Sequence, residues 1–586
     1  MRKELLLLGA FGMLTTATLC AQEFHLQPTP QEYITQKDSV DIPRQYQILS
    51  GNSVQDGPAL PLLRSLMPEE VLGASFRVYI GVKGDKIIKK YQHRIPRKSE
   101  GYFLKIEKDC IVIAGADERG AYYGVQTLAQ LLALDKLPLA EVTDYPDVPY
   151  RGVVEGFYGA PWSQEARIRQ LDFYGRNKMN VYIYGPKDDP YHRTPNWRKP
   201  YPAREGEELK VLVNRAKENN VIFYWAIHPG QDIRWNEEDR SLLLQKFESM
   251  YQLGVRGFAV FFDDISGEGT KADKQAELLN YIDDHFVKVK RDVAPLILCP
   301  TEYNKSWTDV EGGYLTTLGD KLNEGIKVMW TGDMVVATID KSTLDFVNPL
   351  LKRKAYIWWN FPVSDYVQDH LLLGPVYGNG LDIKDDMSAF VSNPMEHAEA
   401  SKISLYSVAD YTWNMENYDS ETSWKHAVRD LMPLHAEYLE IFAAHNSDPG
   451  QNGHRFRREE SVAIQPALSA LLKAYQEKNE IDEDAYRQVA EECRKIIVAA
   501  DGLLASGNEN RPLITEIRPW LIQFKQVGEY GAEVLNMIRL RQQKDAFIGS
   551  YEHARALLVL MGETDAQYKA GIKSGSLHLM PTFNAL

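Results

Sequence analysis

The chain has 586 residues, of which 44% are hydrophobic and 25% charged, and it carries a formal net charge of −14. These values are typical of a soluble globular protein with two to four domains. The acidic balance argues against nucleic acid or an anionic membrane surface as the main partner, because both repel an excess of carboxylates.

The first residues have the order of a secretory signal. Two basic residues precede an apolar run over residues 5–14, and small residues follow up to Ala21. This order predicts a signal peptide over residues 1–21, and hence an exported protein, periplasmic or extracellular, with no transmembrane segment in its mature form. The apolar run is too short to span a bilayer comfortably. Lipidation of Cys20 is a weaker alternative because Leu19 precedes it, and a buried N-terminal helix is a third interpretation.

Residues 22–147 are expected to form an α/β domain. Alternating apolar residues and one stretch of helical spacing predict three strands and a helix, at residues 76–80, 102–106, 111–113 and 119–132. The prolines of residues 144–149 then predict a linker.

From Tyr150 the pattern changes to short apolar runs separated by segments long enough for helices. Eight such runs begin at Gly152, Asn180, Val221, Gly257, Leu296, Lys327, Ala355 and Lys402. Eight strand–helix units predict a (β/α)8 TIM barrel over residues 148–449. A doubly wound sheet alternates in the same way and remains the alternative at this point.

Polar or Gly-rich residues follow most of these runs directly, and the carboxyl ends of barrel strands meet on one face. The run at 258–262 ends in Asp263 and Asp264. A pair of carboxylates is the minimum set of catalytic groups that hydrolysis of a glycosidic bond usually requires. Asp188 and Asp189 form a second pair of the same kind. The other candidate acids at strand ends are Glu155, Glu302, Asp333 and Asp365, although such carboxylates can also cap helices or pair with basic residues.

After residue 449 the chain is expected to be helical. Apolar residues with helical spacing predict a helical bundle over residues 450–586, with helices at 468–475, 486–496 and 520–534. A structural role is the simplest interpretation of this bundle, and self-association as a homodimer stays open. Cys110, Cys299 and Cys493 make neither a disulfide framework nor a metal motif, so no metal or cofactor is expected.

Five long motifs together resemble glycoside hydrolase family 84, which contains bacterial β-N-acetylglucosaminidases and animal O-GlcNAcases. They are residues 151–162, 182–192, 225–230, 261–265 and 358–365. The resemblance covers the N-terminal domain, the barrel and at least part of the helical domain, and it implies that the N-terminal domain is of the hexosaminidase type. Many family members continue with further modules, so it leaves the C-terminal arrangement open.

The resemblance implies a retaining exo-β-N-acetylglucosaminidase that removes terminal β-linked GlcNAc from glycans or glycoproteins, including O-GlcNAc on proteins. Catalysis in that family is substrate-assisted: the 2-acetamido group of the sugar attacks the anomeric carbon and forms an oxazoline. Asp263 is then expected to accept the acetamido N–H, and Asp264 to act as general acid and base. Such mechanisms are exceptions to the scheme with two enzymic carboxylates.

The resemblance also implies roles in sugar binding for eight other residues. Tyr303 is expected to bond the acetamido oxygen, Asp365 and Asn393 the 4- and 6-hydroxyls, and Lys187 and the Gly156 carbonyl the 3-hydroxyl; Asn360 is expected near the glycosidic oxygen, and Trp358 and Cys299 around the acetamido methyl group.

Four alternatives remain beside this hypothesis. A family 20-type β-hexosaminidase is chemically close, but such enzymes have Asp-Glu where this chain has Asp263 and Asp264. A hyaluronidase-like activity is a weaker alternative. From other classes, a sugar-binding protein with a catalytically dead barrel and a scaffold whose helical domain carries the function are distant alternatives.

Overall fold

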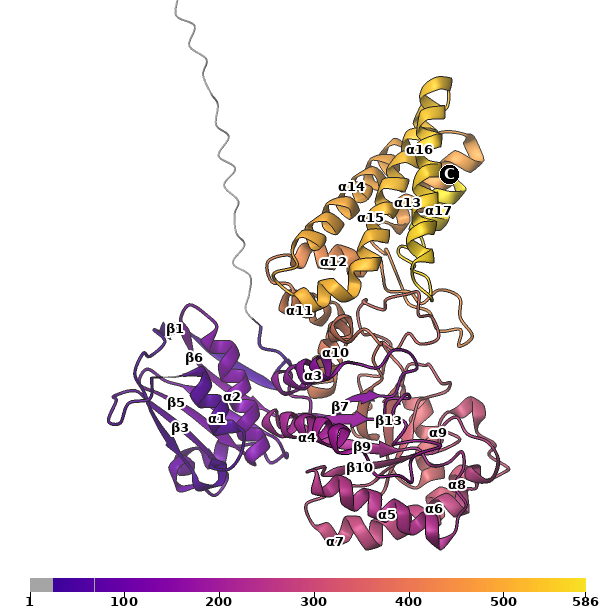
Figure 1. The fold of residues 1–586 in the computed structure, drawn as a ribbon. Helices are drawn as coiled ribbons and strands as arrows, with labels where there is room; N and C mark the ends of the chain where they lie inside the picture. The colour runs from indigo at the N-terminus through magenta and orange to yellow at the C-terminus, as the bar shows by residue number, and fades with distance from the viewer. Residues whose placement is uncertain (1–24, 68) are drawn as a thin grey trace, which may run out of the picture.

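The computed structural model describes residues 25–67 and 69–586, so the predicted signal peptide and Cys20 lie outside the described residues. An α/β domain, a barrel and a helical domain follow one another along the chain (Figure 1). This architecture confirms the predicted fold class and excludes the doubly wound sheet. Over the described ranges, no helix is long and apolar enough to cross a membrane.

The N-terminal domain is built on a six-stranded mixed sheet in the order β1-β6-β4-β5-β3-β2. The strands are β1 (Glu32–Val40), β2 (Gln47–Ser50), β3 (Arg77–Val82), β4 (Tyr102–Ile106), β5 (Cys110–Gly115) and β6 (Leu137–Asp144). The helices α1 (Ala59–Leu66) and α2 (Glu118–Leu132) pack side by side against the sheet (Figure 1). The three strands and the helix predicted here are confirmed as β3, β4, β5 and α2.

The barrel consists of eight parallel strands that close when β14 pairs with β7. The strands are β7 (Tyr150–Glu155), β8 (Val181–Tyr184), β9 (Ile222–Ile227), β10 (Gly257–Phe261), β11 (Ile297–Cys299), β12 (Lys327–Trp330), β13 (Ala355–Trp359) and β14 (Met387–Ser392). Alternate side chains point inward and fill the barrel with an apolar core.

Helices follow most of the strands and surround the barrel (Figure 1). They are α3 (Gln164–Arg176), α4 (Ala203–Glu218), α5 (Glu237–Gln252), α6 (Ala272–Ile282), α7 (Lys288–Lys290), α8 (Tyr314–Lys321), α9 (Lys341–Leu351) and α10 (Ala398–Trp413). The ring of helices packs against the outside of the strands, and apolar side chains of both are buried between them. This packing holds the strands in place and leaves the carboxyl face of the barrel open.

One predicted strand is wrong. The run that begins at Lys402 lies inside α10, and the eighth strand is β14, which the sequence prediction missed. Every residue of α10 is buried, so this helix has no solvent-exposed face and its apolar residues do not show helical spacing. A short apolar run of this kind cannot be told from a strand by periodicity.

The helical domain extends away from the barrel (Figure 1). Its helices are α11 (Ser420–Leu431), α12 (Ala436–Ala444), α13 (Gln465–Lys478), α14 (Glu483–Ala505), α15 (Arg511–Leu540), α16 (Lys544–Ala566) and α17 (Leu579–Ala585). The three helices predicted from apolar spacing are confirmed as α13, α14 and α15. Glu516 of α15 accepts the first N–H groups of α10 at 2.8 and 3.0 Å, which joins this domain to the barrel.

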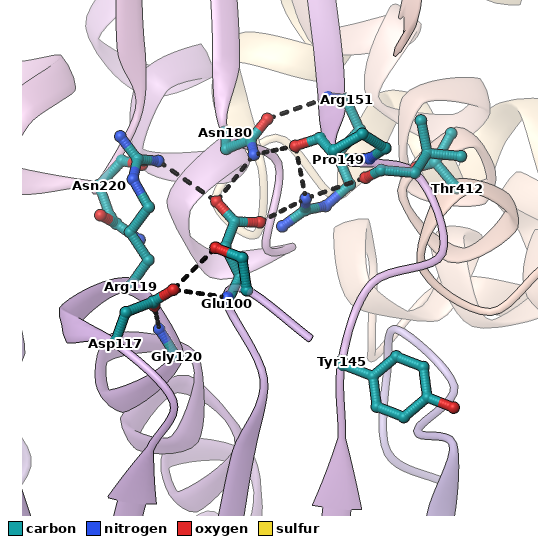
Figure 2. A network of polar contacts seen from close by, with 12 residues as sticks. Glu100, Asp117, Arg119, Gly120, Tyr145, Pro149, Arg151, Asn180, Asn220 and Thr412 are labelled. Atoms are coloured by element: carbon teal, nitrogen blue, oxygen red, sulfur yellow. Dashed lines mark hydrogen bonds and ion pairs between the residues drawn. The ribbon is translucent and has the colours of Figure 1, made fainter. Parts of the chain in front are cut away.

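A buried ion pair joins the N-terminal domain to the first barrel strand (Figure 2). Arg151 Nη1 of β7 lies 2.6 Å from Glu100 Oε2, and the two side chains are 1% and 7% exposed. Asn180, which precedes β8, donates its side-chain amide to Glu100 Oε1 at 2.9 Å. The Arg151 guanidinium also lies over the ring of Trp413 at 4.8 Å. Glu100 therefore neutralises a charge that the barrel wall buries.

We expect Glu100→Ala to destabilise the protein by about 3–5 kcal/mol, because it leaves the Arg151 guanidinium buried without its carboxylate. Thermal unfolding followed by calorimetry measures the change. Glu208→Ala is the matched control, since it removes a carboxylate from the exposed pair Arg204–Glu208 and should cost less than about 1 kcal/mol. Equal effects of the two substitutions would contradict the role given to Glu100.

Candidate active site

The carboxyl ends of the barrel strands surround a cavity of about 400 Å³. Seven of the eight strands supply its lining, directly or through the loops that follow them. All ten residues singled out in the sequence lie on its wall: Gly156, Lys187, Asp263, Asp264, Cys299, Tyr303, Trp358, Asn360, Asp365 and Asn393. The cavity is of the size that small-molecule ligands occupy in proteins.

An ion pair holds the buried member of the adjacent carboxylates. Lys187 Nζ, beyond β8, lies 2.8 Å from Asp263 Oδ2, beyond β10, and both side chains are less than 10% exposed. Burial alone raises the pKa of Asp263, but the positive charge of Lys187 outweighs the effect of burial and holds that pKa well below its ordinary value. Asp263 is therefore an ionised carboxylate, and Lys187 its fixed counter-charge.

The second carboxylate has different surroundings. Asp264 is exposed, and its two oxygens accept hydrogen bonds from Tyr303 Oη at 2.8 Å and from Tyr158 Oη at 2.9 Å. Burial and the neighbouring aspartates raise the pKa of both phenols, so both remain protonated donors. Asp264 has a φ of 53°, in the left-handed region that residues with a Cβ rarely adopt.

Aromatic and amide groups line the inner end of the cavity. Trp358 donates its Nε1–H to Asn360 Oδ1 at 2.9 Å, and Asn393 donates to the same oxygen at 3.0 Å. Asn393 Oδ1 in turn accepts from the N–H of Gly156 at 3.3 Å. A Cβ at Gly156 would lie only 2.5 Å from the Trp358 ring, so this position requires glycine. The chain of bonds fixes the indole as one wall of the cavity.

Asp365 lies on the remaining wall and is bonded to the main chain of a neighbouring loop. Its Oδ2 accepts from the N–H of Tyr158 at 2.9 Å. Burial raises the pKa of Asp365, and this N–H bond opposes the shift. Because Tyr158 also bonds Asp264, its loop links the two carboxylates across the mouth of the cavity.

Sequence reasoning missed several residues of the wall. They are Tyr158, Trp307, Thr331, Val335, Val336, Val363, Tyr366 and His454. Tyr158 follows β7 within a motif that had already been singled out, so its position was a usable signal. His454 comes from the segment between α12 and α13, where no strand end pointed to it.

The alternative acids other than Asp365 lie elsewhere. Asp189 Oδ2 accepts from the hydroxyls of Tyr184 and Tyr201 at 3.0 and 2.7 Å, and Glu155 forms an ion pair with Arg167 at 2.6 Å. Asp188, Glu302 and Asp333 are likewise absent from the cavity wall. In the described part of the chain, no group of three or more His, Cys, Asp or Glu side chains is arranged to hold a metal ion.

Comparison with known proteins assigns the family. A family model for beta-N-acetylglucosaminidase matches residues 151–444, about half of the chain, and a model for the bacterial GH84 post-catalytic domain matches residues 460–586. The chain belongs to glycoside hydrolase family 84. A third model, for domain 2 of glycosyl hydrolase family 20, matches residues 23–145. The family 84 match therefore spans the barrel that carries the cavity.

Individual relatives agree with this family. The solved structure described as "Structure of CpGH84B" is 31% identical, with a TM-score of 0.87 over 96% of this chain and 100% of that one. A mutant of the Thermobaculum terrenum O-GlcNAc hydrolase is 26% identical, with a TM-score of 0.66 over 75% of this chain and 94% of that one. Protein O-GlcNAcase of Rattus norvegicus is 35% identical over 276 residues. That match covers 45% of this family 84 chain and only 30% of the rat protein.

Lys187→Met tests the ion pair through protein stability. Asp263, whose folded-state pKa is lowered, stabilises the protein above its unfolded pKa of about 3.9, and this contribution is lost as the pH falls through the folded value. Without Lys187, burial should raise the pKa of Asp263 instead. We then expect a loss of about 3–5 kcal/mol at pH 8 that shrinks as the pH falls toward 5, measured by thermal unfolding.

The double variant Lys187→Met with Asp263→Asn is the control for this experiment. It removes both charges of the pair, so it should recover most of the stability at pH 8 and lose the dependence on pH. A single variant that is equally destabilised at pH 5 and pH 8 would contradict the assigned charge of Asp263.

Proposed function

We propose that the chain is a retaining exo-β-N-acetylglucosaminidase that works by substrate assistance. One observation carries the proposal: Asp263 and Asp264 line one pocket in unlike surroundings, the first buried beside Lys187 and the second exposed at the mouth. Two titratable groups in different environments can have different roles in catalysis, one as a fixed charge and the other as the general acid and base.

In the first step, the acetamido oxygen of the sugar attacks the anomeric carbon while the bond to the leaving oxygen breaks. The Asp263 carboxylate accepts the acetamido N–H and stabilises the positive charge that develops on that nitrogen. Lys187 keeps Asp263 ionised for this purpose. Tyr303, whose hydroxyl donates to Asp264, is proposed as the donor toward the acetamido oxygen.

Asp264 moves the protons of both steps. It gives a proton to the leaving oxygen, so that the aglycone departs as an alcohol. A cyclic oxazoline remains on the sugar in its protonated form, with its N–H still hydrogen-bonded to the Asp263 carboxylate. Asp264 then takes a proton from water, whose oxygen attacks the anomeric carbon and reopens the ring to the acetamide. Two displacements on the same carbon give net retention.

The shape of the pocket supports removal of a terminal sugar. Trp358, Cys299 and Asn393 at the inner end are at most 5% exposed, whereas Tyr158 and Trp307 at the mouth are 45% and 49% exposed. A single pyranose placed against the inner wall would direct its glycosidic oxygen outward. Asp365, Asn393, Lys187, Gly156 and Asn360 are the proposed partners of the sugar hydroxyls and the glycosidic oxygen.

The names of the relatives suggest the substrate. Both the rat protein and the Thermobaculum protein are described as hydrolases of O-GlcNAc. Because the aglycone lies outside the pocket in this proposal, we infer that GlcNAc linked to a protein hydroxyl is accepted alongside terminal β-linked GlcNAc on glycans.

The family 20 alternative has one observation in its favour. The family 20 model matches residues 23–145, which is the N-terminal domain and not the barrel with its cavity. The cavity contains adjacent aspartates rather than the Asp-Glu pair expected of that family. The match therefore supports a shared type of N-terminal domain rather than a different activity.

Hydrolysis of aryl N-acetyl-β-glucosaminides with progressively fluorinated N-acyl groups tests the mechanism. Fluorine withdraws electrons from the acetamido oxygen, so the rate should fall steeply along the series if that oxygen is the nucleophile. Asp263→Asn should reduce kcat by about 10²–10³-fold, because it removes the charge that stabilises the acetamido nitrogen. Asp188→Asn, which replaces an aspartate outside the cavity wall, is the control and should retain wild-type kcat. A rate indifferent to fluorination would overturn substrate assistance.

We also propose that the protein is exported. Mass spectrometry of the protein purified from its native cells measures the N-terminus. Cleavage after Ala21 predicts an N-terminal Gln22, whereas a lipidated N-terminus at Cys20 would show an acylated peptide instead. Retention of Met1 in the secreted fraction, or recovery of the protein only from the cytoplasm, would contradict export.

A further inference from the structure

The two catalytic carboxylates are neighbours in the chain, and this raises a geometric problem. In an extended strand, successive side chains point to opposite faces, so a continued β10 would send only one of them into the pocket. The strand ends at Phe261, and Asp264 adopts a φ of 53°. This left-handed turn brings both side chains to the same cavity. Residues other than glycine rarely adopt such a conformation, so contacts with the surrounding residues must stabilise it.

Three hydrogen bonds hold the main chain of this corner. The N–H of Phe262 donates to the carbonyl of Cys299 at 2.9 Å, and Thr301 Oγ1 donates to the carbonyl of Phe262 at the same distance. His228 Nε2 lies 2.7 Å from the carbonyl oxygen of Asp263. The first two bonds fix the chain before the aspartates. The third fixes the peptide unit between them.

His228 is itself held firmly in place. It follows β9, and its main-chain N–H donates to the carbonyl of His192 at 2.7 Å. His228 is buried, with 5% of its surface exposed. Its Nε2 also lies 3.5 Å from the carboxylate oxygen Oδ1 of Asp263, which is too far for a good hydrogen bond. Among the described residues, Asp263 Oδ1 accepts no hydrogen bond. The imidazole therefore faces both the main chain and the carboxylate of Asp263, and it is not on the cavity wall.

We propose that His228 is a positioning residue for the catalytic pair. Its Nε2–H, donated to the carbonyl of Asp263, fixes the peptide unit between the two aspartates and so sets the direction of both carboxylates. The neutral tautomer with a proton on Nε2 suffices for this bond. The proposal rests on the proposed function, because it concerns the reaction that the pair performs. It adds a residue that touches neither the substrate nor the cavity.

The test compares His228→Leu with His228→Gln. Leucine removes the donor, whereas the Gln amide places an N–H near the position of Nε2. We expect His228→Leu to lower kcat by about 10²-fold, the size of effect that a small misplacement of catalytic groups produces, with KM little changed. His228→Gln should recover most of kcat. His228→Asn, whose amide is too short to reach the carbonyl, should behave like His228→Leu if the leucine variant does not fold.

The choice of substrate separates positioning from a general loss of structure. Departure of a poor leaving group depends on the proton from Asp264, whereas a dinitrophenyl group departs without it. The loss in His228→Leu should therefore be larger for a methoxyphenyl than for a dinitrophenyl N-acetyl-β-glucosaminide. Thermal unfolding of each variant shows whether the loss of kcat follows the loss of stability.

Each outcome decides the proposal. Unchanged kcat in His228→Leu, equal losses in the Leu and Gln variants, or equal losses for the two leaving groups would overturn it. Wild-type protein that hydrolyses neither substrate would instead overturn the proposed function. The two failures are thus distinguishable by the wild-type control.

Discussion

The site depends on the cost of burying a carboxylate. An unpaired charge in a protein interior is so unfavourable that the group takes up a proton. Asp263 avoids this because β8 and β10 both pair with β9, so that Lys187, two strands away, lies 2.8 Å from it. The ion pair therefore keeps a charged carboxylate on the wall of the pocket. The hydrogen bonds of Trp358, Asn360 and Asn393 build the rest of the wall around that fixed charge.

The first barrel strand connects this site to the N-terminal domain. At one end of β7, Arg151 is bonded to Glu100, and one residue past its other end, Gly156 contacts the amide of Asn393 in the cavity. A second buried pair, Lys178–Asp144 at 3.1 Å, lies beside Trp413 of α10, whose Nε1–H donates to Asp144 at 2.8 Å. The N-terminal domain thus contacts both β7, the strand whose pairing with β14 closes the barrel, and α10, the helix that follows β14.

The sequence predicted the features that depend on short-range pattern. Strands β7 to β13 have a buried apolar run followed by polar residues, and residues at the ends of all of these strands except β9 line one cavity. Prediction from the sequence failed where burial of a helix on all sides removed the helical spacing of its apolar residues. The helix α10 is buried on all sides, so its apolar residues show no helical spacing and one short run resembled a strand, and β14 was overlooked beside it.

The missed wall residues show a second limit of the sequence. Tyr158 lies in a loop whose path is set by hydrogen bonds to Asp365 and to Glu396, and neither partner is near it in the chain. The left-handed conformation of Asp264 is also invisible in the sequence, because it is imposed by His228 and the other contacts of the corner rather than by a glycine. Long-range contacts of this kind become evident only in the folded chain.

One wall residue makes the three-domain description incomplete. His454 belongs to the segment that connects α12 to α13, beyond the barrel, and its ring lies 4.9 Å from that of Tyr366 on the cavity wall. The pocket is therefore completed by a part of the chain that folds with the helical domain. Exchange of that domain between relatives, by recombination or by protein engineering, would replace part of the pocket wall.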